Sequence, residues 1–227
     1  MKRVITVLLA VLLVLSLAAC GSGVETKKLA GTWTCTIDVT DRMNAAAEQA
    51  LGLSAADGTA QMPLQLVLTV TEDGAYTLRY DSDAVRTALD AYAAALRPTA
   101  VESVYAAAEE QGFSREEYDA AMEKAGITMD DMVAAIFAGV DEEELLSLLT
   151  GRSAAITGYC RAESGQLYLA DTAAELAETA DCLSYTLSDG TMTWTDAQGE
   201  LSSQLTEQEQ ELLRVPLTWT RQAEESK

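Results

Sequence analysis

The chain has 227 residues, of which 36 are acidic and 15 basic, so its formal net charge is −21 at pH 7. This charge argues against nucleic acid as a partner, because nucleic-acid binding requires basic patches. The absence of histidine excludes His-based acid–base chemistry, Ser-His-Asp triads and His-ligated zinc. The acidic residues follow no calcium-loop pattern, so we expect a solvated acidic surface and neither a metal nor another cofactor.

The first nineteen residues have the organisation of a bacterial export signal. Two basic residues precede sixteen mostly apolar ones, 4–19. As a helix this run would span about 24 Å, less than the roughly 30 Å of a bilayer core. It ends in LAAC, residues 17–20, a string that resembles the lipobox of bacterial lipoproteins. The resemblance implies that Cys20 is lipidated and becomes the first mature residue. The alternative is an ordinary export signal with a chance cysteine.

A lipid on Cys20 would hold the protein at the extracytoplasmic face of the cell membrane. Two or more acyl chains anchor a protein stably, since each buried methylene contributes about 0.8 kcal/mol. Residues 20–28 are then a lipidated tether that starts with the flexible GSG of 21–23. Removing residues 1–19 takes away two basic residues, so the mature charge is 13 − 36 = −23. An anionic membrane surface would repel such a domain, and the lipid must anchor it alone.

Strands and one helix are predicted first along the mature chain. Residues 31–39 alternate strictly between apolar and polar side chains, which indicates a half-buried strand. Residues 41–52 have the composition of a short helix. Two alternating runs within 64–81 flank Asp73-Gly74, and this arrangement is a strong hairpin signal.

Residues 82–150 change to helical periodicity. Arg97-Pro98 is expected to end the first helix, because the residue before a proline disfavours the helical conformation. Capping boxes at Ser114–Glu117 and Thr128–Asp131 open the third and fourth helices. The pattern predicts helices at about 83–97, 101–112, 114–126, 128–139 and 141–149.

Strands resume at residue 156 and continue to the end of the domain. Two hairpins are expected around Ser164-Gly165 and Asp189-Gly190, followed by a short helix capped by Thr206. The last strand is predicted at 215–221, and residues 222–227 are a polar tail. The chain therefore has eight predicted strands, which carry all three tryptophans.

Eight antiparallel strands with one apolar face close readily into a barrel. The sequence resembles the lipocalin-like (calycin) barrels, because Gly31-Thr-Trp33 matches their Gly-x-Trp and Arg221 matches a basic residue placed over that tryptophan. With its lipobox and acidic helices, it resembles more closely the lipocalin-like lipoproteins of anaerobic Gram-positive bacteria. The resemblance implies an α+β fold: an eight-stranded antiparallel barrel over 29–221, with an all-α insertion at 82–150 between the third and fourth strands.

Two non-catalytic functions remain open. An eight-stranded barrel is either filled by its own side chains or holds one small ligand. A small apolar ligand would be lined by aromatic and methionine side chains, namely Tyr76, Tyr80, Tyr185, Met192, Trp194 and Trp219. Alternatively, the barrel is fully packed and the helical insertion binds an envelope protein. We do not expect an enzyme, because no nucleophile lies beside a recognisable base.

Three cysteines remain after lipidation. Cys35 shares a strand face with Trp33, so we expect a buried thiol. A bond between Cys160 and Cys182 is disfavoured, because a strand at 166–171 should separate theirs by about 9.5 Å, beyond the roughly 7 Å reach of a disulfide.

Overall fold

The structure, a computed structural model, describes residues 24–53, 60–137, 155–178, 182–198 and 213–223. The expected export signal, Cys20, and the helices expected at 141–149 and after Thr206 lie outside the described residues. The chain divides into two compact units. The first contains residues up to 35, 66–80 and 154 onward, and the second contains 36–65 and 81–153.

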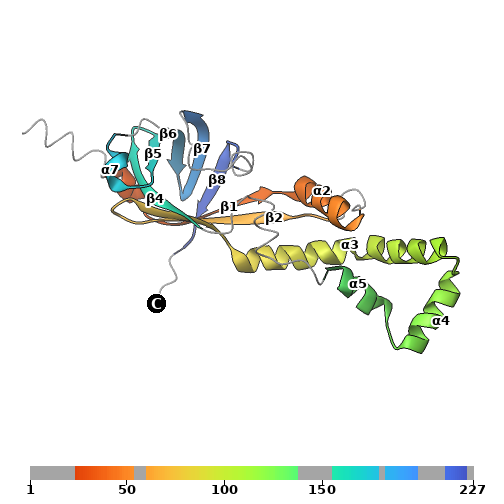
Figure 1. Cartoon of the computed structure of the whole chain (residues 1–227). Helices are drawn as coiled ribbons and strands as arrows, with labels where there is room; N and C mark the ends of the chain where they lie inside the picture. The colour runs from red at the N-terminus through yellow and green to blue at the C-terminus, as the bar shows by residue number, and fades with distance from the viewer. Residues whose placement is uncertain (1–23, 54–59, 138–154, 179–181, 199–212, 224–227) are drawn as a thin grey trace, which may run out of the picture. The chain divides into compact units, whose positions relative to one another are not determined.

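Eight antiparallel strands form a closed barrel in which neighbours follow chain order (Figure 1). The number, order and direction of these strands confirm the expected antiparallel barrel, and helices lie between the third and fourth strands as predicted. The strands are β1 (Gly31–Asp38), β2 (Pro63–Val70), β3 (Ala75–Tyr80), β4 (Ile156–Glu163), β5 (Gln166–Ala170), β6 (Cys182–Ser188), β7 (Thr191–Gln198) and β8 (Leu217–Arg221).

The barrel closes through pairing of its first and last strands. Trp33 lies opposite Arg221 and Thr34 opposite Thr220 in an antiparallel register between β1 and β8. The predicted pairing of these strands is confirmed. Closure leaves no exposed sheet edge, which is how barrels avoid edge-to-edge association.

All tight turns lie at one end of the barrel. The β2–β3, β4–β5 and β6–β7 turns contain Gly74, Gly165 and Gly190, each at positive φ, where glycine is favoured. Residues 24–29 form a helical turn at the same end, which the sequence analysis did not predict. Because neighbouring strands run antiparallel, every longer connection leaves from the opposite end.

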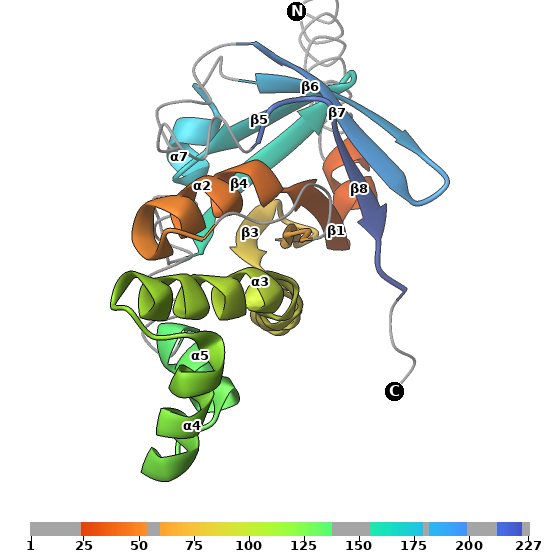
Figure 2. The same cartoon turned by 90° about the vertical axis from the view of Figure 1, so that its right-hand side faces the viewer.

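The helices outside the barrel belong mainly to the second unit. They are α2 (Thr40–Leu51), α3 (Ser82–Glu110), α4 (Arg115–Ala125) and α5 (Met129–Phe137). Both α4 and α5 contact α3 (Figure 2). The first unit has one further short helix, α7 (Ala173–Leu176), between β5 and β6.

The two helices predicted at 83–97 and 101–112 are in fact one. Helix α3 runs through Pro98, so the expectation that Arg97-Pro98 ends a helix is wrong. Ten of its 29 residues are alanine, the strongest helix former. Leu96 and Ala100, on either side of the proline, are both buried. Packing on both sides of Pro98 therefore offsets the hydrogen bond that the proline cannot donate.

One hydrophobic cluster in the second unit comes from distant parts of the chain. Leu53, Ala100 and Val133 are buried together, so α3, α5 and the segment after α2 share one cluster. The Tyr92 hydroxyl donates a hydrogen bond to the Asn44 side chain at 2.7 Å, which ties α3 to α2. Partly buried side chains that pack on the cluster are Val101, Met129, Ile136 and Phe137.

Predicted capping boxes are present where the sequence placed them. Ser114 and Glu117 satisfy each other's backbone N–H groups at the start of α4, and Thr128 and Asp131 do the same before α5. Thr172 makes an equivalent box for α7, which the sequence analysis missed because only four helical residues follow.

Candidate functional site

The interior of the barrel is the candidate site, because it gathers all three tryptophans of the chain and two buried tyrosines. Trp33, Trp194 and Trp219 are all buried. The alternating burial along the strands assigns these side chains to the inner face. Period-two patterning therefore predicted the core-facing tryptophans correctly, but Leu187, expected on the same face as Tyr185, is exposed beyond a register shift in β6.

The six residues predicted to line a cavity share the inner face. Tyr76 and Tyr80 lie opposite Val70 and Leu66, and Tyr80 is partly exposed where β3 ends. Burial raises the pKa of the Tyr185 hydroxyl, and the nearby Glu25 carboxylate and Cys160 raise it further. The five members that are buried are Tyr76, Tyr185, Met192, Trp194 and Trp219.

Tyr76 lies against a strand position that has no side chain. A Cβ built on Gly158 would come within 2.9 Å of a Tyr76 ring carbon, 3.0 Å of its hydroxyl and 2.5 Å of the Ala170 carbonyl oxygen. The backbone at Gly158 has no positive φ, so the glycine is required by space alone. The sequence analysis did not single out Gly158, because a glycine inside an alternating strand does not reveal which side chain covers it.

Trp194 and Trp219 form a contacting pair between β7 and β8. Their ring centroids are 4.8 Å apart and the planes are tilted by 47°. Both indole nitrogens are buried, and neither has a hydrogen-bond partner among the described residues. Buried donors without partners are rare in folded proteins, and each costs about 1–3 kcal/mol. The pair therefore presents two unused donors in the barrel core.

Trp33 is fully satisfied, in contrast. Its indole N–H donates to the Leu29 carbonyl oxygen at 2.8 Å. The Arg221 guanidinium carbon lies 4.5 Å from the centre of the Trp33 ring, and the Nη2 of the same group donates a hydrogen bond to the Lys28 carbonyl oxygen. The predicted cation–π contact is confirmed. Gly31, the third signature residue, begins β1 at φ 129°, where a side chain would be strained.

The helical turn at 24–29 closes this end of the barrel. Leu29 is buried and accepts the Trp33 hydrogen bond. Thr26 is buried and accepts a hydrogen bond from the backbone N–H of Ala162 on β4 at 3.0 Å. This turn is therefore fixed to β1, β4 and, through Lys28, β8. Residues 24–28 were expected to belong to the tether, because so short a segment shows no helical periodicity.

All three described cysteines are free and buried. This confirms the buried thiol expected at Cys35 and the expectation of no bond between Cys160 and Cys182. Strand β5 does separate the strands of these two residues. Burial raises the pKa of Cys35, and it raises the pKa of Cys160 to about 12. Thiols this reluctant to ionise are poor nucleophiles and poor metal ligands.

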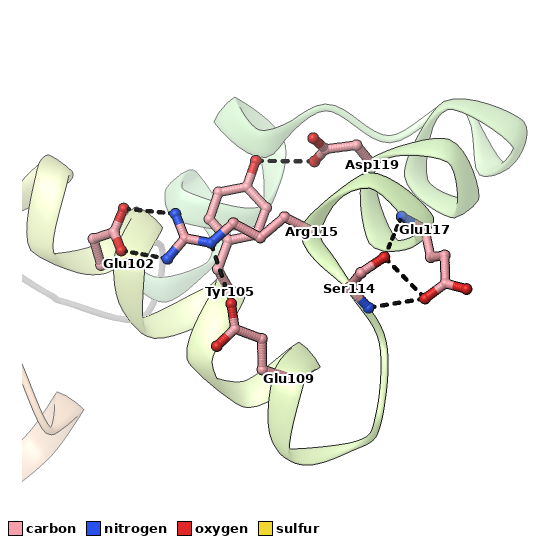
Figure 3. Close-up of polar contacts among 7 residues, drawn as sticks. All are labelled: Glu102, Tyr105, Glu109, Ser114, Arg115, Glu117 and Asp119. Carbon is pink, nitrogen blue, oxygen red and sulfur yellow. Dashed lines mark hydrogen bonds and ion pairs between the residues drawn. The ribbon is translucent and has the colours of Figure 1, made fainter.

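A polar cluster joins α3 to α4 in the second unit (Figure 3). Arg115 binds Glu102 with two hydrogen bonds, the shorter 2.7 Å, and binds Glu109 at 3.2 Å. It also lies over the Tyr105 ring, whose hydroxyl donates to Asp119 at 2.9 Å. Hydrogen bonding to Arg115 lowers the pKa of Glu102. Because these groups are exposed and already paired with one another, we interpret the cluster as a structural contact that fixes the turn between α3 and α4.

Two further properties concern only the described ranges. No group of three or more histidine, cysteine or acidic side chains there is arranged to hold a metal ion. None of the helices there combines the length and apolarity needed to cross a bilayer. Comparison with known proteins adds no relative, since no family model, no curated protein and no solved structure matches the chain.

Proposed function

We propose that this protein is a lipocalin-like lipoprotein, anchored through Cys20 at the extracytoplasmic face of the membrane, whose barrel binds a small ligand without catalysis. The observation that carries the binding proposal is the Trp194–Trp219 pair with its two unpartnered indole N–H groups. A bound acceptor would remove the cost of leaving both donors unsatisfied.

The lining restricts the chemistry of such a ligand. Tyr76, Tyr185 and Met192 supply large apolar surfaces, while the two indoles supply only donors. Indole N–H groups carry no charge to pair with a buried anion. The ligand class that fits is a small, mainly apolar molecule with a neutral carbonyl or ether oxygen. Such sites characteristically combine an apolar lining with a few polar groups.

Native mass spectrometry of the protein purified from its own host tests this proposal. We expect a small molecule to accompany the wild-type protein. Trp194→Phe and Trp219→Phe each remove one donor and keep an aromatic ring. Each should therefore reduce the fraction of protein that retains the small molecule at least several-fold. Trp33→Phe is the matched control. The Trp33 N–H already donates to the Leu29 carbonyl oxygen, so removing it should leave the fraction of protein that retains the small molecule unchanged.

A packed barrel would give a different result. No adduct in the wild-type protein, together with unchanged or increased stability of both phenylalanine variants, would mean that the indoles are merely core. The binding proposal would then fail.

A second candidate function is protein binding by the helices. Of the large hydrophobic side chains in the described part of the second unit, Phe113 and Ile127 are the exposed ones, and they flank the two ends of α4. Met122, by contrast, is buried and Met129 packs on the core of the unit. Loss of an envelope partner from affinity-purified Phe113→Ser/Ile127→Ser protein, with the native fold retained, would favour this function.

A further inference from the structure

We propose that the end of the barrel closed by residues 24–29 lies directly against the phospholipid surface. This inference rests on the proposed lipid anchor at Cys20 and goes beyond it, since anchoring alone sets no orientation. The surface, called here the plug end, consists of the helical turn 24–29, the β2–β3, β4–β5 and β6–β7 turns and the end of β8.

The first argument is the length of chain between the anchor and the barrel. Three residues lie between Cys20 and Val24, so the four Cα–Cα steps reach at most about 14 Å even when the chain is fully extended. Thr26 and Leu29 are already part of the barrel's buried structure. The barrel therefore begins within about 14 Å of the lipidated residue, about twice the thickness of one headgroup layer, and the end it presents there is the plug end.

The second argument is that the plug end exposes apolar side chains. Four large hydrophobic residues are exposed in the described part of the chain, and two of them belong to this end. Val24 is 55% exposed in the helical turn, and Leu187 is 37% exposed next to the β6–β7 turn. That turn is at the same end, because the Gly190 carbonyl accepts the Arg221 backbone N–H at 2.8 Å.

The third argument is the distribution of charge. Lys27, Lys28 and Arg221 are exposed at the plug end. The acidic residues there are Glu25, Glu72, Asp73, Asp189 and Glu163, the last of which pairs with Arg161, so the balance is 4 − 5 = −1 and this end is close to neutral in a strongly acidic chain.

Most of the acidity lies elsewhere in the chain. Residues 82–137, which span α3 to α5, carry four basic and eleven acidic side chains, a balance of 4 − 11 = −7. Repulsion by an anionic bilayer falls off over about 8–10 Å at physiological salt. With the plug end toward the lipid, the part of the first unit nearest the bilayer is therefore its nearly neutral end.

Protection of introduced thiols tests the orientation. Lipidated full-length protein is inserted from outside into vesicles of phosphatidylglycerol and phosphatidylcholine in equal parts, then treated with a maleimide-linked polymer. Leu187→Cys and Ser188→Cys report on the plug end, and Ala174→Cys in α7 reports on the opposite end of the same unit. The three native thiols that remain beside Cys20 are buried. Unlipidated Cys20→Ser versions give the intrinsic reactivity of each site.

We expect the vesicles to slow labelling at residues 187 and 188 about tenfold or more relative to residue 174, after correction for intrinsic reactivity. Equal protection at both ends in protein that floats with the vesicles would overturn the orientation and leave the anchor intact. Protein from the host that carries no lipid and stays in the soluble fraction would overturn the anchor, and the orientation with it. The use of two adjacent plug-end positions guards against a local effect of either substitution.

Discussion

The three buried tryptophans differ in what their indole nitrogens do. Trp33 donates to Leu29 within the same short stretch of chain, while Trp194 and Trp219 have no partner in the described residues. A satisfied donor stabilises the fold, whereas an unsatisfied one is tolerated only where packing, water or a ligand compensates for it. We therefore assign Trp33 to barrel closure and the other pair to the proposed ligand site.

At Trp33 we expect truncation to be costly. Trp33→Ala should lower the free energy of unfolding by about 3–5 kcal/mol, as large truncations in cores do. Arg221→Met, which keeps much of the side-chain volume, should lower it by about 1–2 kcal/mol, because it removes the cation–π contact and the bond to the Lys28 carbonyl. Urea unfolding followed by far-UV circular dichroism measures both changes.

Arg86→Met is the matched control for Arg221, since Arg86 forms an exposed i,i+3 ion pair with Asp83 and exposed pairs contribute little. Its effect should stay below about 0.5 kcal/mol. An Arg221→Met effect no larger than this control would show that the guanidinium does not stabilise the closure.

Strands were easier to predict than helices for a physical reason. Each strand buries one face of a closed barrel, so its sequence carries the period of two directly, and turns such as Asp73-Gly74 limit its length. Whether α3 continues through Pro98 depends instead on packing around the proline, which a rule based on neighbouring residues cannot include. The turn 24–29 and α7 are shorter than two helical turns, so neither shows a helical period.

The residues of the candidate site could be predicted only as members of a strand face. Alternation placed Tyr76, Trp194 and Trp219 on one surface, and it also placed Cys35 there. It could not show that Gly158 makes room for Tyr76, or which indole nitrogens lack partners. Those facts depend on contacts between strands that are far apart in the sequence.

Removing the proline from α3 should stabilise the protein. Pro98→Ala restores a donor in the middle of a helix, and prolines at such positions cost about 3 kcal/mol or more. Part of this gain is lost because alanine gives the unfolded chain more freedom. We expect an increase of about 1–3 kcal/mol in the free energy of unfolding, measured by thermal unfolding. Thr99→Ala serves as the control at a neighbouring position. A loss of stability would instead show that burial of Leu96 and Ala100 depends on the proline.

The second unit is not continuous in sequence. Its core joins Leu53 from one segment to Ala100 and Val133 from another, and the Tyr92–Asn44 hydrogen bond links the same two segments. The expected insertion at 82–150 therefore packs partly against residues outside it, which belong to the segment 36–65. Helices α4 and α5 have only 11 and 9 residues, and isolated helices shorter than about 12–15 residues are marginal in water.

We accordingly expect the fragment 81–153 to unfold without a cooperative transition in thermal scans by circular dichroism. A second fragment, which joins 36–65 to 81–153 through a short Gly-Ser linker, should regain cooperativity. The linker can be short because the backbone N–H of Asp81 donates to the Gln65 carbonyl oxygen at 2.9 Å. Cooperative unfolding of 81–153 by itself would instead make the helical insertion an independent domain.

Pairing of β1 with β8 also sets an order of events during folding. The hydrogen bond between Trp33 and Leu29 spans four residues and forms early, whereas Thr34 meets Thr220 across 186 residues. Contacts this distant in sequence slow folding, because the loop entropy is lost before the contact forms. A chain that leaves the ribosome or a translocation pore N-terminus first exposes one edge of β1 until residues 217–221 emerge. The last strand is therefore the last to become available, and a nascent chain that stops before it carries an open sheet edge.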